Sequence, residues 1–427
     1  MHRKHHLSFL KRTLSKLPAA IASLILCSAA SAQSNCNADI SGDGAVNGVD
    51  LAEVLANWGV CQANPTISGV YPSTGPTQGG TAIAIVGVDL GNTASVTIDG
   101  VLAPQFDVVS ATVVTAVTPP GTTGSRSVVI RDKQGQQIAG STFTYVVVDL
   151  PWATVLEQVP NAAVVTNATL RNAIIATGYP WRVRDNGTGI EMLLVPPGSF
   201  LMGCSPSIQS TCRSHETPIH SVTILSPFYM GRYEVTQLQW TSKMGANPSA
   251  FQAASPEVPA AQVLHRPVEL VTWSMISGEG GFLSDTGLRL PTEAEWEYAY
   301  RGGTTTAFHG WPANPSGFND AAQLNLICWH GYNSASQTHP VGMKAGNGFG
   351  LHDMSGNVYE WVNDWYSDSY YARSAPTDPT GPHTGTARVL RGGSWFNPTD
   401  DQRASFRFLQ SPNSTYHDFG FRVARNP

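Results

Sequence analysis

The residues that could do chemistry first appear between Asp39 and Asp50, where oxygen-bearing side chains recur at the spacing of a calcium loop. They stand at positions 1, 3, 5, 9 and 12 of this segment, with Gly at position 6 and a usable backbone carbonyl at position 7. A twelve-residue loop of this kind can wrap six or more oxygens around Ca²⁺. A metal-free acidic turn is the alternative. The predicted ligands are Asp39, Ser41, Asp43, Ala45, Asn47 and Asp50.

A short helix is expected directly after this loop. Leu51, Val54, Leu55 and Trp58 recur at i, i+3, i+4 and i+7, which describes one apolar helix face. Loop and helix together resemble the calcium-binding repeat of dockerin domains, which implies an EF-hand-like module over residues 36–61. Dockerins usually carry two repeats and one is found here, so a cohesin-like or cell-surface attachment partner and a purely stabilising role both stay open.

Residues 1–32 have the features of a signal peptide. A basic start is followed by an apolar run from Leu17 to Ala30 and by the cleavage pattern Ala30-Ser31-Ala32. A membrane anchor is the alternative, but it needs about 20 uninterrupted apolar residues, and Pro18 interrupts this shorter run. We therefore expect a secreted protein without a transmembrane segment, located outside the cell, at its surface or in the periplasm.

The charge balance restricts the partners of the mature protein. The leader holds five basic and no acidic residues, so its removal takes the formal net charge from -5 to -10. Phosphate binding depends on clustered Lys and Arg, and no such cluster follows the leader. Nucleic acid is excluded as an expected partner, and an unidentified extracellular protein or glycan is expected instead.

Five cysteines follow the leader, and disulfides are the default in an oxidising compartment. The pairs Cys36–Cys61 and Cys204–Cys212 are predicted to bridge, which leaves Cys328 as the unpaired thiol.

Residues 65–147 predict an all-β module. Ala82–Val86, Ser95–Ile98 and Ser127–Ile130 are short strands separated by Gly and Pro turns. The segments Ile67–Thr81 and Thr142–Tyr145 resemble the start and end of IPT/TIG immunoglobulin-like domains, which implies a sandwich. The module shows no catalytic residues, so we expect a spacer or adhesive role. Residues 148–189 are predicted to be a linker, with one short helix over 169–176.

The largest module covers residues 190–427 and carries five motifs in a fixed order. They are Met192–Gly203, Phe228–Thr236, Arg289–Glu297, Gly356–Trp361 and Arg391–Trp395. In this order they resemble the formylglycine-generating enzymes, or sulfatase-modifying factors. The resemblance implies an α+β fold related to C-type lectins, preceded here by the immunoglobulin-like sandwich and the small EF-hand-like helical segment.

Several motif residues have a structural interpretation of their own. Thr292 and Glu295 form the T-x-x-E pattern of a capping box. Glu293, Glu295 and Glu297 are therefore predicted to form a helix start and its solvated face rather than a catalytic site. Three tryptophans are assigned to the core, Trp296, Trp361 and Trp395.

The family resemblance also implies one or two calcium ions in this module, because its positions fall on oxygen donors. Turn capping by the same Asn and Asp residues is the alternative. For the first ion the predicted side-chain ligands are Asn325 and Asn333, with the carbonyls of Leu326 and Ala335. For the second they are Asp353 and Glu360, with the carbonyls of Gly356 and Val358.

The cysteine pair that the family uses for oxidation falls on Asn397 and Gln402 in this sequence, and no cysteine follows Cys328. Thiolates hold monovalent copper and an amide cannot, so neither copper nor oxidase activity is expected. The histidines of this module show no helical i, i+4 pair and are predicted to serve surface or packing roles; they include His215, His220, His265, His330, His339 and His352. A non-catalytic binding or scaffold protein is the first hypothesis, and an exported oxidase with a rearranged site is the alternative.

Overall fold

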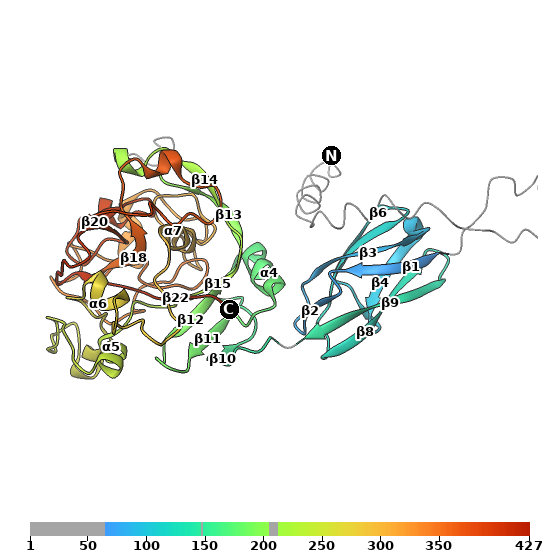
Figure 1. Cartoon of the computed structure of the whole chain (residues 1–427), viewed down its shortest axis with the longest axis horizontal. Helices are drawn as coiled ribbons and strands as arrows, with labels where there is room; N and C mark the ends of the chain where they lie inside the picture. Colours follow the sequence, from blue (N-terminus) through green and yellow to red (C-terminus); the bar gives the residue numbers. More distant parts are fainter. Residues whose placement is uncertain (1–64, 147, 205–211) are drawn as a thin grey trace, which may run out of the picture.

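The computed structural model describes residues 65–146, 148–204 and 212–427. The predicted signal peptide, the calcium loop and the Cys36–Cys61 pair lie outside the described residues. Within these ranges the chain forms a β-sandwich followed by a larger α+β domain (Figure 1). None of the helices in the described ranges has both the length and the apolar character needed to cross a membrane.

The sandwich is built from two sheets whose inner faces share one core. In spatial order, one sheet contains β1 (Thr66–Tyr71), β3 (Ala82–Val88), β7 (Val113–Val117) and β6 (Gln105–Ser110). The other contains β2 (Thr74–Pro76), β9 (Gln137–Val146), β8 (Gly124–Asp132), β4 (Thr93–Ile98) and β5 (Val101–Leu102). In β8, Val128 and Ile130 alternate with more exposed residues and are fully buried. The three strands predicted from the sequence lie within β3, β4 and β8 and are confirmed.

Two sheets and two strand pairs support the C-terminal domain. The larger sheet runs β10 (Ala153–Glu157), β11 (Arg182–Asp185), β12 (Glu191–Val195), β15 (Phe228–Gly231) and β22 (Ala424–Arg425). The smaller runs β20 (Phe408–Gln410), β19 (Arg388–Arg391), β18 (Tyr359–Trp365) and β21 (Phe419–Gly420). The pairs are β13 (Gly198–Met202) with β14 (His220–Ile224), and β16 (Cys328–Trp329) with β17 (Ser355–Gly356).

The helices of this domain are short, and long irregular segments connect them. They are α4 (Ala168–Thr177), α5 (Gln237–Met244), α6 (Trp273–Ser277) and α7 (Glu293–Arg301). Single turns of 3₁₀ helix are η2 (Ser214–Glu216), η3 (Ala260–His265), η4 (Ala321–Leu326), η5 (Tyr370–Arg373) and η6 (Thr399–Gln402). The predicted capping box of Thr292 and Glu295 is present and starts α7. Every residue of α7 except Glu295 is buried, and Figure 1 shows this helix inside the domain.

The segment predicted to be a linker, 148–189, is instead part of the domain. It contributes β10 and β11 to the larger sheet, and Ile174, Trp181 and Val183 join the hydrophobic core at 0–2% exposure. The short helix expected within it is confirmed as α4, which is capped by the Asn167 side chain. The sequence did not predict β11 because its four residues, Arg-Val-Arg-Asp, are too few and too charged to form an apolar run.

Candidate functional site

The segment that leaves β19 is where the family resemblance places the cysteine pair. It turns at Gly392 and Gly393, whose φ angles are 91° and 72°. A side chain at Gly393 would also collide with its surroundings, because its Cβ would lie 2.3 Å from Gln402 Oε1. Glycine is therefore required for the close approach of Gln402 to this turn.

Asn397 and Gln402 belong to the framework of this segment. Ser394 Oγ donates a hydrogen bond to Asn397 Oδ1, and Asn397 Nδ2 donates to Asp401 Oδ2 at 3.2 Å. Gln402 is fully buried, and its Nε2 donates to the backbone oxygen of Ser394 at 3.1 Å. The two amides hold the turn together at positions where the resemblance implies thiols. They cannot ionise to thiolates, so they offer neither a copper(I) ligand nor a sulfur nucleophile.

The cysteines in the described part of the chain do not replace that pair. Cys204 and Cys212 form the predicted disulfide. Cys328 is free and buried, as expected for the unpaired thiol. Burial raises the pKa of the Cys328 thiol well above its ordinary value, so this group stays protonated at neutral pH.

The prediction of a solvated face for α7 is wrong for Glu293 and Glu297, which are 2% and 0% exposed. Glu297 forms ion pairs with Arg301 at 2.7 Å and with Arg391 at 2.5 Å. Glu293 pairs with Arg407 at 2.6 Å. Burial alone would raise the pKa of Glu297, but Arg301 and Arg391 outweigh it and hold that pKa below its ordinary value. Arg391 and Arg407, the partners in β19 and beyond, lie far from α7 in the sequence. Helical periodicity alone therefore predicted a solvent-exposed face where the structure has a buried one.

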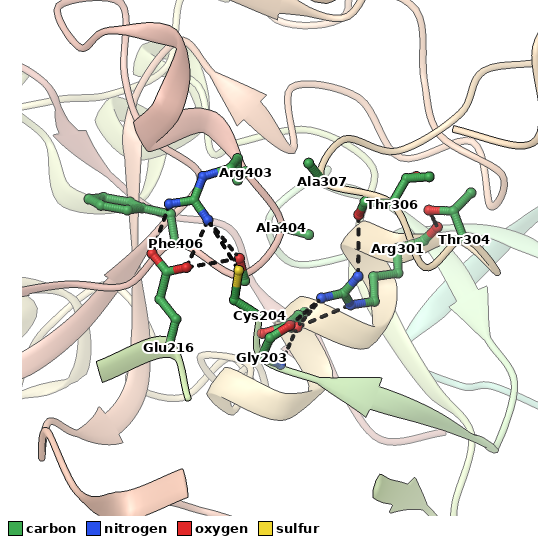
Figure 2. Close-up of polar contacts among 12 residues, drawn as sticks. Gly203, Cys204, Glu216, Arg301, Thr304, Thr306, Ala307, Arg403, Ala404 and Phe406 are labelled. Carbon is green, nitrogen blue, oxygen red and sulfur yellow. Dashed lines mark hydrogen bonds and ion pairs between the residues drawn. The ribbon is translucent and has the colours of Figure 1, made fainter. Parts of the chain in front are cut away.

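A further ion pair fixes the chain next to the disulfide. Arg403 Nη1 and Nη2 donate to Glu216 Oε2 and Oε1 at 2.7 and 2.9 Å, and Figure 2 shows both side chains beside Cys204. In the same view Arg301 reaches the backbone oxygen of Gly203, at 3.0 Å. The start of the disulfide loop is thereby fixed both to α7 and to the residue that follows Gln402.

The other end of the disulfide loop contacts the candidate site directly. Arg213 Nη2 donates to Asp401 Oδ1 at 2.7 Å, and Asp401 accepts from Asn397 through its second oxygen. The guanidinium of Arg213 also lies over the ring of Phe406, 4.5 Å from its centroid. Sequence reasoning missed Arg213 and Asp401, since no motif links residues that are 188 positions apart.

Large aromatic side chains are exposed beside Asn397. Phe396 and Tyr332 are 66% and 79% exposed, and the hydrogen bond from Gly331 N to Asn397 O joins their two chain segments at 2.9 Å. Trp395, the predicted core residue, is 5% exposed and packs against Phe396 edge to face, with ring centroids 5.5 Å apart. We call the surface formed by Tyr332, Phe396 and Asn397 the aromatic face. Two exposed rings on adjoining segments offer apolar contact area to a partner.

The residues predicted for the second calcium ion lie in a buried acidic cluster. Asp353 and Glu360 are 1% and 0% exposed, and together with Glu234 they act on one guanidinium, that of Arg422. Arg422 Nη2 and Nε bind Glu360 Oε1 and Oε2 at 2.5 and 2.6 Å. Asp353 Oδ1 is buried and has no hydrogen-bond partner. Burial raises the pKa of Asp353 to about 6.

Asp353 therefore offers one unpartnered buried oxygen, but Arg422 already supplies the positive charge of this cluster, and the full predicted ligand set is not assembled. A buried carboxylate oxygen without a partner is costly, and a hard cation would satisfy it. Glu360 already has both oxygens engaged by Arg422. Gly356 and Val358 lie on the chain between these acids, and Val358 N donates to Glu234 Oε1 at 3.0 Å.

The first calcium set is assembled differently. Asn333 Nδ2 donates to Asn325 Oδ1 at 3.0 Å, so the structure brings the two predicted side chains together. However, Lys344 Nζ donates to the Asn325 carbonyl at 2.6 Å, and the Leu326 carbonyl accepts from Ala345 N at 3.0 Å. Ala335 follows on the same loop with a φ of 53°. With an ammonium group at the site and its oxygens hydrogen-bonded, this set does not fit a calcium ion as it stands.

The histidines within the described ranges do not combine into a metal site. Across residues 65–146, 148–204 and 212–427, no group of three or more His, Cys, Asp or Glu side chains is placed to hold a metal ion. His339 stacks on Trp329 with centroids 3.7 Å apart, and His330 Nε2 lies 2.8 Å from Asn325 Oδ1. These contacts agree with the packing roles predicted for them.

Comparison with known proteins assigns both described domains. Residues 65–146 match the IPT/TIG domain, which confirms that resemblance, and residues 180–427 match the sulfatase-modifying factor enzyme 1-like domain. The formylglycine-generating enzyme of Thermomonospora curvata is 30% identical over 291 residues, which cover 55% of this chain and 93% of that enzyme.

Other similar proteins have different titles. The serine/threonine-protein kinase pkn1 of Chlamydia caviae is 33% identical over 254 residues, and the match covers 55% of this chain but 38% of the kinase. This chain thus spans less than half the length of that relative. Among solved structures, Treponema denticola variable protein 1 is 32% identical with a TM-score of 0.47, covering 56% of this chain and 95% of that one.

Proposed function

We propose, from the premise that this chain belongs to the sulfatase-modifying factor enzyme 1-like family, that its C-terminal domain binds a ligand and has lost the family's cysteine-based oxidation. One observation carries the proposal. Asn397 and Gln402 stand where the cysteine pair is expected, and their amides are built into the turn at Ser394. Fold similarity alone does not assign chemistry, so the residues at the site decide.

The aromatic face supports a binding role for the same region. Phe396 and Tyr332 remain exposed, although burying either ring would be favourable. The ion pairs below hold this segment rigidly, and rigid support favours recognition because less entropy is lost on binding. An extracellular protein or glycan is the proposed partner.

The test combines metal analysis with oxygen uptake on a cysteine-containing sulfatase peptide, after copper(I) is offered to the purified protein. The natural chain should retain no copper and consume no oxygen. The variant N397C/Q402C, which restores a thiol pair at the family spacing, should retain about one copper(I) because two thiolates are strong soft ligands. Copper-dependent turnover by the natural chain would overturn the proposal and favour an exported oxidase with a rearranged site.

We extend the proposal to calcium and to export. One ion is proposed for the loop at 39–50 and one at Asp353, where a buried oxygen lacks a partner. D43A should remove one bound ion and D353N the other, measured by equilibrium dialysis with radioactive calcium; unchanged stoichiometry in either variant would contradict that site.

N-terminal sequencing of the exported protein should begin at Gln33, whereas a chain beginning at Met1 would contradict cleavage.

A further inference from the structure

A cleft of about 610 Å³ lies away from the aromatic face. Its walls come from the hairpin of β11 and β12, from α5, from η3 and from residues 340–343. None of residues 394–402 lines it. Its volume is within the range of small-molecule sites, which is roughly 300–1,000 Å³.

The lining of this cleft combines uncharged polar groups with small apolar patches. Gln239, Ser242 and Gln262 supply amide and hydroxyl groups. Leu238 and Met343, also in the lining, are 45% and 52% exposed. The Oε1 atom of Gln239 accepts from Thr236 N in the capping box of α5, so Gln262 is the amide with both groups left for a ligand. Such an amide and a hydroxyl, beside short apolar surfaces, suit a ring that carries hydroxyl groups on its edges and C–H groups on its faces.

A group of charged residues adjoins the cleft through Arg184 and Glu191, which line it. Glu191 lines the cleft and faces the guanidinium groups of Arg184, Arg232 and Arg182 at 3.2, 3.4 and 3.8 Å. Arg182 has a second carboxylate partner, Glu157, at 3.0 Å. Three cations therefore meet two anions, in a chain whose net charge is -5. The Nε atoms of Arg182 and Arg232 are buried without a hydrogen-bond partner.

Arg184 is the cation in this group that a ligand can reach. It lines the cleft, its side chain is 50% exposed, and it shares Glu191 with two other arginines. A ligand carboxylate could pair with it through a planar two-bond contact without displacing Glu191 from Arg232.

We propose that this cleft binds a carboxylate-bearing saccharide, with Arg184 pairing the carboxylate and Gln262 and Ser242 binding ring hydroxyls. The site is separate from the aromatic face, so it adds a second binding function to the one proposed above. Uronic acid units have this chemistry, with one carboxylate, several hydroxyls and an apolar ring face.

Isothermal titration of the whole mature chain with trigalacturonate tests this proposal, with a neutral galactose trimer as the comparison ligand. R184Q should weaken trigalacturonate binding about tenfold, the usual cost of losing one charge-assisted hydrogen bond. K243Q is the matched control, since Lys243 is an exposed cation on α5 that does not line the cleft; it should change the affinity less than about twofold. Q262A, on an exposed position of η3, should weaken binding of the acidic trimer severalfold without touching a charge.

Absence of trigalacturonate binding, equal binding of the neutral trimer, or equal effects of R184Q and K243Q would each overturn the proposal. Thermal unfolding of R184Q and Q262A separates a lost contact from a lost fold. F396A distinguishes the two proposed sites, because it should leave trigalacturonate binding unchanged. If F396A abolishes that binding while R184Q does not, the saccharide is bound by the aromatic face and the cleft proposal fails.

Discussion

The two ends of the stretch from Arg391 to Arg407 contrast with its middle. At the ends, Arg391 and Arg407 are 0% and 1% exposed and form ion pairs with Glu297 and Glu293 of α7. In the middle, Asn397 and Gln402 stand at the positions where the resemblance implies a cysteine pair. The ends determine how the segment is positioned and the middle determines what it can react with. The buried ion pairs that position this segment, which we call the frame, are therefore separate from the residues at the turn.

The difference has an energetic basis. A buried charge without its partner costs several kcal/mol, so any one member of the buried network is difficult to replace alone. A residue at the turn, by contrast, needs only to satisfy the hydrogen bonds of Ser394 and Asp401, which an amide does. The motifs that identify this family therefore indicate mainly that these buried ion pairs are present.

The largest effect is expected from breaking the frame. E297A leaves Arg391 and Arg301 without their shared carboxylate, and it should destabilise the C-terminal domain by about 3–5 kcal/mol. Urea unfolding followed by tryptophan fluorescence measures this, because ten of the eleven tryptophans lie within residues 148–427 and the sandwich, residues 65–146, contains none. E157A is the matched control, since its ion pair with Arg182 is partly exposed, and it should cost less than about 1 kcal/mol. Equal costs would show that the buried network is not the frame.

The disulfide should come next. The bridge closes a loop of sequence separation 8 and holds Arg213 near Asp401. C204S/C212S should lose about 2–3 kcal/mol through the greater freedom of the unfolded chain. Guanidinium unfolding with and without a reducing agent checks the cause, because reductant should destabilise the C-terminal domain of the natural chain but not that of the double variant. A reductant effect of equal size in both would contradict it.

An intermediate effect is expected from acid. Burial lowers the pKa of His309 to about 4, and its Nε2 has no hydrogen-bond partner. An ordinary histidine in the unfolded chain has a pKa near 6.5. Between about pH 4 and 6.5 the unfolded chain therefore binds a proton at His309 that the folded chain does not bind. The contribution of His309 to stability is therefore complete above about pH 6.5, and it is lost toward pH 4 by about 2–3 kcal/mol.

H309Q should reduce the change in unfolding free energy between pH 4.5 and 7.5. The midpoint of urea unfolding, determined at several pH values in this range, measures that change. His265 is exposed in η3, and H265Q serves as the control that should leave the slope unchanged. A slope that persists in H309Q would assign the acid sensitivity to other groups.

Much of the fold could be predicted from the sequence, because the patterns that indicate it are local. The capping box at Thr292, the Cys204–Cys212 bridge and the strands of the sandwich each depend on residues close in sequence. The surroundings of Glu293 and Glu297 could not, since their partners come from distant strands and change an apparent solvent face into a buried one. The two calcium sets show the same limit. Lys344 and Arg422, which decide how those oxygens are used, belong to neither motif.

The smallest effect on stability is expected at the aromatic face, and it gives the sharpest comparison. Phe396 is 66% exposed and its neighbour Trp395 is 5% exposed. F396A should change the free energy of unfolding by less than about 0.5 kcal/mol, as for other surface residues. W395A should cost about 3–5 kcal/mol through the cavity it leaves. If F396A proves as costly as W395A, Phe396 is part of the frame and its exposure no longer argues for binding. If the two differ as expected, Phe396 contributes little to stability from its exposed position, as the proposed binding role requires.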